Sequence, residues 1–153
     1  MTQKLRNPGA EIDFGILPAL IGYQLRLAQI AIFGDFALTL GELDITPGLY
    51  GVLVIIEANP GLKQTELARA THLDRSTVVS VIDNLERRAL VDRRAAATDR
   101  RSNSLQLTPD GKALLKKLKR LVNEHEQRLK GNLSENEQAT LIRLMRKILP
   151  EHR

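Results

Sequence analysis

Cysteine and tryptophan are absent from the 153 residues, and aromatic residues make up only 3% of the chain. The lack of cysteine excludes disulfide bonds, thiol catalysis and thiol redox sensing, and it favours a cytoplasmic location. With so few aromatic residues, the core must consist mostly of Leu, Ile, Val and Ala. The N-terminal sequence lacks the pattern of a secretory signal, and no uncharged apolar stretch reaches about 18 residues. We therefore expect no signal peptide and no membrane span.

Residue patterns typical of enzymes are missing as well. The three histidines, His72, His125 and His152, have no second His or Cys at the spacing of metal ligands. The sequence contains no Gly-rich phosphate loop and no Ser in a nucleophile motif. Since Glu124 and Glu126 flank His125, we place that histidine on a surface or interface helix. The sequence therefore predicts no catalytic residue, no metal site and no cofactor.

Basic residues are concentrated in the middle of the chain, although the net charge is only +5. Residues 63–130 contain 16 Lys and Arg against 9 acids, whereas residues 1–62 contain 3 and 6. A basic middle segment favours a polyanionic partner such as nucleic acid. A soluble, Lys-rich surface would have the same composition, so the arrangement of the charges must decide between the two.

The longest apolar segment runs from Leu17 to Leu43 and predicts one long helix with Pro18 in its first turn. Its apolar residues occur almost all round the helix, which indicates burial on more than one side. A single small domain seldom buries a helix so fully, so we expect a second chain to cover it. Capping residues and apolar periodicity predict further helices at 47–58, 63–70, 75–89, 109–130 and after Ser134.

The two short helices at 63–70 and 75–89 are separated by a tight turn, which is the helix-turn-helix pattern. On the second helix the apolar residues share one side, and the opposite side is small and polar. Such a polar face fits a DNA major groove, where Ser and Asn meet bases or phosphates and Arg reads guanine. An ordinary solvated helix looks the same, but the preceding short helix and the following hairpin favour DNA. The predicted inward residues are Val78, Val81, Ile82, Leu85 and Ala89, and the outward ones are Ser76, Ser80, Asn84 and Arg87.

A predicted hairpin follows, with "LVDRRAA" and "SNSLQLT" as its strands around "AATDRRS". A hairpin directly after a recognition helix is a wing, and its tip reaches a neighbouring minor groove that attracts arginine. Arg93 and Arg94 enter the predicted tip, and Arg100 and Arg101 leave it. Asp99 would repel phosphate, so its presence makes sense if it holds an arginine side chain extended. An ordinary acidic turn residue beside solvated bases is the alternative.

Several motifs follow one another between Leu62 and Leu115. They are the E-L-A of the first short helix, the S-T-V that opens the second, "NLERRALVDRR", the D-R-R of the wing and "LTPDGKALL". This series resembles the core of MarR-family transcriptional regulators. The resemblance implies a mainly α fold with a small β-wing, namely a winged helix-turn-helix with an intertwined helical dimerisation region. It assigns residues 1–45 and 109–153 to dimerisation and residues 46–108 to DNA binding.

The resemblance also implies which residues contact a double-stranded DNA operator. Arg101 matches the wing arginine that enters the minor groove, and Asp99 matches the acid that orients it. The groove-facing start of the recognition helix corresponds to Arg75, Ser76, Thr77 and Ser80. The expected DNA-binding residues are Arg75, Ser76, Thr77, Ser80, Asn84, Arg94, Asp99, Arg100 and Arg101.

The chain departs from the family pattern at three positions near these residues. His72 stands where the family often has Gly in the turn, Ala89 where Gly commonly follows the recognition helix, and Lys63 where Ser or Thr is usual. If His72 or Ala89 requires a positive φ, strain on the order of 1 kcal/mol follows. None of the three departures removes a residue expected to contact DNA.

Most of the aromatic residues lie in the first two predicted helices. Members of the family commonly release DNA when a small aromatic ligand binds, so the resemblance implies an effector site there. The first predicted helix contains "GYQLRLAQIAIFGDF", which resembles regulators that respond to hydroxycinnamoyl-CoA or related aromatic-acid thioesters. Arg26 can pair with an anionic ligand, although pairing with an acid at a dimer interface is the alternative. The expected effector-binding residues are Tyr23, Arg26, Phe33, Phe36 and Tyr50.

These observations together predict a homodimeric transcriptional repressor. Its expected partners are operator DNA, a second copy of the chain, and an aromatic acid or acyl-CoA that releases it from the DNA. A DNA-binding dimer that responds to no ligand, and is controlled by its abundance or by a protein partner, is the alternative.

Overall fold

The computed structural model describes residues 12–96 and 99–149, and for residues 95, 96 and 99–103 it describes the backbone alone. The chain forms two compact units, the first ending at Asp35 and the second beginning at Phe36. Each unit is described by itself. The first contains the short 3-10 helix η1 (Leu17–Ala19) and most of α1 (Ile21–Leu40).

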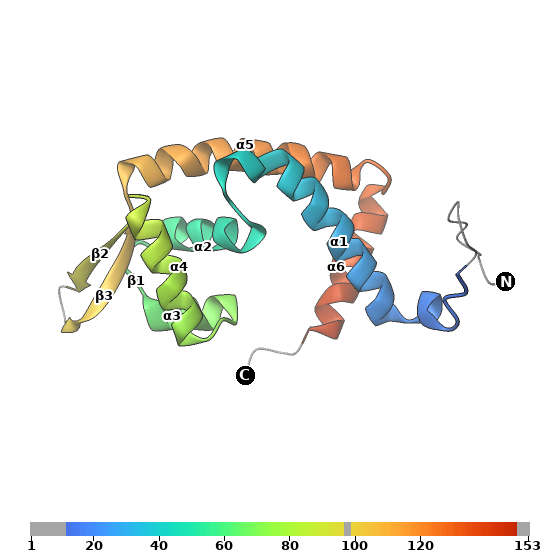
Figure 1. Ribbon diagram of the computed structural model, residues 1–153, viewed down its shortest axis with the longest axis horizontal. Coiled ribbons are helices and arrows are strands. Elements are labelled where there is room, and N and C mark those ends of the chain that lie inside the picture. Colours follow the sequence, from blue (N-terminus) through green and yellow to red (C-terminus); the bar gives the residue numbers. More distant parts are fainter. Residues whose placement is uncertain (1–11, 97–98, 150–153) are drawn as a thin grey trace. The chain divides into compact units, whose positions relative to one another are not determined.

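The second unit contains the helix-turn-helix, the wing and two long C-terminal helices. Figure 1 shows α2, α3 and α4 gathered beside the strands, with α5 leaving the base of the wing. This order confirms the predicted mainly α fold with a small β-wing. The elements after α1 are η2 (Gly41–Leu43), α2 (Pro47–Ala58), β1 (Leu62–Lys63), α3 (Gln64–Thr71), α4 (Arg75–Arg87), β2 (Val91–Ala96), β3 (Asp99–Leu107), α5 (Pro109–Lys130) and α6 (Glu135–Ile148).

The first helix is shorter than the sequence predicted. Leu20 is extended, with φ −87° and ψ 127°, and therefore separates η1 from α1. At the other end, Gly41–Leu43 forms a 3-10 turn before Asp44 adopts a left-handed conformation with φ 50°. In the part of the chain that the structure describes, no single helix is long and apolar enough to cross a membrane. The bent pair of Ile21–Leu43 and Pro47–Ala58 passes that test only when the two are taken together.

The wing is the larger part of a three-stranded antiparallel sheet in the order β1-β3-β2. In the register of β2 and β3, Val91 lies opposite Leu107 and Arg93 opposite Leu105, with an irregularity after Ala95. Strand β1 pairs Leu62 with the same Leu105. Sequence reasoning missed β1 because two residues are too few to show an alternating pattern.

The core of the second unit joins the helix-turn-helix, the wing and α5 into one packed body. Aliphatic side chains dominate it, as the scarcity of aromatic residues predicted. Since α2, α3, α4, β3 and α5 all contribute, the recognition helix and the base of the wing share one support. Fully buried members include Leu53, Leu67, Ile82, Leu85, Leu105, Leu115 and Leu118.

A close approach of α5 to the end of α4 fixes the base of the wing. The Thr108 hydroxyl donates to the Ala89 carbonyl at 2.7 Å, and the Thr108 N–H donates to the Leu90 carbonyl at 3.1 Å. The same hydroxyl accepts from the Gly111 N–H at 2.9 Å and so caps α5. At this position a Cβ on Gly111 would lie 2.0 Å from the Leu90 carbonyl oxygen, so only glycine fits here.

The two positions suspected of strain do carry it. His72 ends α3 with φ 56°, and Ala89 connects α4 to β2 with φ 55°. A left-handed conformation costs a residue with a Cβ about 1–2 kcal/mol. Glycine would adopt the same conformation at either position without this cost.

We expect Ala89→Gly to raise the free energy of unfolding by about 1 kcal/mol, because glycine adopts the left-handed conformation without strain. Chemical denaturation at one protein concentration measures this. The matched control is Ala113→Gly, at an exposed position within α5, which should lower stability by a similar amount. If both variants lose stability equally, Ala89 is not strained.

Candidate nucleic-acid interface

The two helices of the helix-turn-helix are capped by different means. Lys63 precedes α3 without a capping hydroxyl, and the Glu66 carboxylate accepts the Lys63 N–H at 2.8 Å instead. Asp74 caps α4, as predicted, by accepting the Thr77 N–H at 2.8 Å. The unusual Lys63 therefore leaves α3 intact, because its backbone rather than its side chain takes part in the cap.

The Asp74 carboxylate also binds both neighbouring hydroxyls. It accepts from the Ser76 hydroxyl at 2.5 Å and from the Thr77 hydroxyl at 2.7 Å. These hydrogen bonds, led by that of Ser76, hold the pKa of Asp74 well below its usual range. The cap is therefore ionised at neutral pH, which suits the positive end of the helix dipole.

This arrangement limits what the predicted hydroxyls can offer DNA. Ser76 and Thr77 donate to Asp74, and the Ser80 hydroxyl donates to the Ser76 carbonyl at 3.1 Å. Each oxygen keeps lone pairs that can accept from a base amino group. Binding a phosphate, which only accepts, would require the hydroxyl hydrogen to turn away from its present partner.

The exposed face of α4 differs in part from the predicted one. Ser76, Ser80 and Arg87 are exposed as expected, and so is Arg75 in the first turn. Thr77 and Asn84 are only half-buried and lie beside Leu49 of α2, where they line a shallow hollow. Two further exposed residues, Val79 and Asp83, were not assigned to DNA. Ala89, expected to point inward, is exposed because α4 ends at Arg87.

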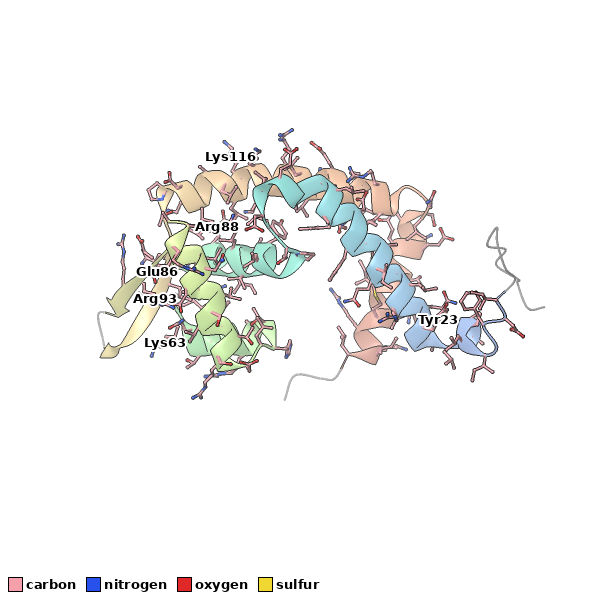
Figure 2. All side chains as sticks on the ribbon, viewed as in Figure 1. Tyr23, Lys63, Glu86, Arg88, Arg93 and Lys116 are labelled. Atoms are coloured by element: carbon pink, nitrogen blue, oxygen red, sulfur yellow. The ribbon has the colours of Figure 1, made fainter. Side chains whose placement is uncertain are left out.

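Arg93 does not extend toward the wing tip, contrary to the prediction. Its Nη2 lies 2.5 Å from Asp83 Oδ1 and its Nη1 2.5 Å from Glu86 Oε2, so it faces α4. Figure 2 shows Arg93 beside Glu86 between α4 and the strands. Arg94 is the next residue of β2, and neighbouring side chains of a strand point to opposite faces. It is 64% exposed and 3.8 Å from Asp92.

The remaining wing residues lie at the start of β3. The backbone of β3 begins with Asp99, Arg100 and Arg101, whose side chains lie outside what the structure describes. Their expected pairing therefore stays a prediction.

Arg88 makes a connection that the sequence did not reveal. Its Nη1 donates to the Asp44 carbonyl at 2.9 Å and its Nη2 to the Leu43 carbonyl at 2.9 Å. Arg88 directly follows α4, as Figure 2 shows, so the end of the recognition helix is tied to the segment before α2. The partners are more than forty residues apart in sequence, which is why no local pattern indicated them.

Two of the five expected effector residues are brought together. Phe36 is buried, and its ring centroid lies 6.5 Å from that of Tyr50 and 5.5 Å from that of His125. His125, which we placed on a surface or interface helix, is itself buried, whereas the adjacent Glu124 on α5 is exposed. The other three, Tyr23, Arg26 and Phe33, belong to the first unit, where Arg26 and Phe33 are exposed. Within the described ranges, no group of three or more His, Asp or Glu is arranged to hold a metal ion.

Comparison with known proteins places this geometry in a family. Residues 43–102 match the MarR family. A Thauera aromatica protein assigned as a transcriptional regulatory protein for the hcr operon is 40% identical over 140 residues, which cover 91% of this chain and 84% of that protein. The transcriptional repressor CouR bound to a 23-mer DNA duplex is 37% identical, with a TM-score of 0.86 over 91% of this chain and 99% of its own. CouR bound to p-coumaroyl-CoA is 34% identical, with a TM-score of 0.84 over 92% of this chain and 99% of its own. The chain belongs to the MarR family of winged helix-turn-helix transcriptional regulators.

Proposed function

We propose that the protein is a cytoplasmic, homodimeric transcriptional repressor that leaves its operator when it binds an aromatic acid or its CoA thioester. The observation that carries this proposal is the exposed face of α4. The opposite face of the helix packs on the core, and the wing directly follows the helix. A helix presented in this way fits a major groove, and the wing then meets the neighbouring minor groove. The likeness to CouR, which was solved on a DNA duplex, supports the same role.

The DNA contacts divide between the helix and the wing. On α4, Arg75 is exposed beside the helix N-terminus, and Ser76 and Ser80 face outward along it. In our proposal Thr77 and Asn84 contact DNA at the edge of α4 nearest α2, where both are half-buried. The wing contributes the exposed Arg94, together with Asp99, Arg100 and Arg101 at the start of β3.

The unpartnered apolar side chains of the C-terminal helix support dimerisation. None of the residues of α6 is buried within the chain, and its large apolar residues are exposed. An apolar face of this size on a soluble protein indicates a partner surface. We propose that residues 1–45 and 109–153 form the helical dimerisation region and that the dimer interface lies within it, so that two recognition helices lie about 10 base pairs apart on the operator. The exposed residues on α6 are Leu141, Ile142, Leu144, Met145 and Ile148.

An aromatic effector agrees with both the relatives and the residues. CouR has been solved with p-coumaroyl-CoA, and the present chain aligns with that structure over 92% of its length. Arg26 is exposed and offers a guanidinium to a carboxylate or phosphate, which arginine binds in a bidentate manner. The proposed effector residues are Tyr23, Arg26, Phe33, Phe36 and Tyr50.

A gel-shift titration tests the proposal, using the DNA upstream of the protein's own gene. We expect a specific protein–DNA complex. We also expect p-coumaroyl-CoA or a related thioester to dissociate this complex, whereas CoA alone should not. A specific complex that none of these compounds dissolves would favour the alternative of a repressor controlled by abundance or a protein partner. Failure to bind this DNA specifically at moderate salt would contradict autoregulation through the α4–wing interface.

A further inference from the structure

A cluster of three charged residues joins the wing to the recognition helix, and we call it the wing clamp: Arg93 of β2 with Asp83 and Glu86 of α4. Both ion pairs measure 2.5 Å, and the Arg93 side chain is only 19% exposed. The Arg93 N–H also donates to Glu86 Oε1 at 3.3 Å. The clamp therefore holds both the side chain and the backbone of β2.

The geometry of the clamp suits arginine in particular. Asp83 and Glu86 are three residues apart and so project from the same side of α4. The planar guanidinium reaches both carboxylates with different nitrogens, which an ammonium group on a flexible stem cannot do with the same rigidity. In the register of the sheet, Arg93 of β2 lies directly opposite Leu105 of β3, which is fully buried in the core. The wing base is thus held from α4 and from the core, while the hairpin continues beyond it to Asp99–Arg101.

The clamp also explains why carboxylates are tolerated beside DNA. Asp83 is exposed on the same face of α4 as Ser80 and Arg87. A free carboxylate there would repel phosphates, and the single positive charge of Arg93 neutralises one of the two carboxylates that it contacts. However, neutralisation needs only a positive charge. The two short contacts and the backbone hydrogen bond also define the orientation of β2 relative to α4.

We propose that Arg93 is a positioning residue for operator binding: it sets the angle between α4 and the wing so that the recognition helix and Arg101 engage DNA together. This inference rests on the proposed function. In this arrangement Arg93 itself contacts no DNA, and its effect on affinity is exerted through the wing tip.

A double-mutant cycle of Arg93→Lys and Arg101→Ala tests this role, with operator affinity as the readout. Lysine keeps the positive charge but lacks the planar guanidinium that reaches both carboxylates. We therefore expect Arg93→Lys to weaken operator binding about tenfold. In the Arg101→Ala background the same change should lower operator affinity only slightly, because the wing then lacks the arginine whose position Arg93 controls. A merely structural role would reduce affinity equally in both backgrounds.

The matched control is Arg120→Lys, the same replacement at an exposed ion pair of α5 with Glu124 at 3.4 Å, and it should leave affinity unchanged. Glu86→Gln is the second clamp variant, for use if Arg93→Lys fails to fold, and it should show the same dependence on Arg101. Additive losses in the cycle, or full affinity of Arg93→Lys, would overturn the positioning role. If the wild type binds no operator while remaining folded, the proposed function itself fails, and the inference fails with it.

Discussion

Replacing Gly111 by alanine is expected to lower the free energy of unfolding by about 3 kcal/mol, or the melting temperature by roughly 10 °C. The added Cβ would lie 2.0 Å from the Leu90 carbonyl oxygen and 2.9 Å from its carbonyl carbon. Both atoms are backbone and cannot rotate aside like the end of a side chain. To relieve the overlap, α5 must move away from Leu90 and break the bonds that Thr108 makes to Ala89 and Leu90.

The same substitution at Gly51 is the control for this experiment. Gly51 lies within α2, and a Cβ there would meet no atom within 4 Å. Because alanine is the better helix former, Gly51→Ala should raise stability by about 0.5–1 kcal/mol. Denaturation of both variants at one protein concentration avoids the concentration dependence of a dimer. Equal stability of Gly111→Ala and the wild type would show that α5 and the wing base are not in close contact in solution.

Replacing Arg101 by alanine is expected to weaken operator binding by more than about tenfold while leaving the proposed dimer intact. An arginine in a narrow minor groove gains from the strong negative potential there, and alanine cannot replace it. The loss of one cationic contact should also reduce the dependence of affinity on salt by about one counterion. Gel-shift or anisotropy titrations at several salt concentrations measure both effects, and size-exclusion chromatography reports the dimer.

Lys116→Ala is the control for Arg101→Ala, since it removes one positive charge from the exposed side of α5 at a position that is not among the residues proposed to contact DNA (Figure 2). We expect its operator affinity and salt dependence to match the wild type. If Arg101→Ala also matches the wild type, the wing tip takes no part in binding, and α4 must carry the interaction alone.

The two changes act at opposite ends of the hairpin. Gly111 and Thr108 hold its base against the end of α4, and Arg101 lies near its tip. Arg93 connects the same base to the outward side of α4. We expect a wing held at several points to move with the recognition helix, so a rotation of α4 would also displace the wing from the minor groove that we propose it enters.

The order of helices and the position of the recognition helix could be predicted from the sequence alone. Thr46, Asp74, Thr108 and Ser134 cap their helices as expected, each accepting from a backbone N–H three residues later. Such signals act over three or four residues and are therefore visible without any knowledge of packing. The same holds for the apolar stripe of α4, although Asn84, which was predicted on the outward side, is half-buried.

Contacts between distant segments were decided by the tertiary structure. The sequence alone does not distinguish Arg93 from the other wing arginines. Its side chain faces Asp83 and Glu86 because β2 packs beside α4. Arg88 finds two carbonyls, and His125 is buried against Phe36, only because the chain brings distant segments together. Sequence periodicity shows which side of an element is apolar, whereas the partner of a polar side chain depends on what the fold places opposite it.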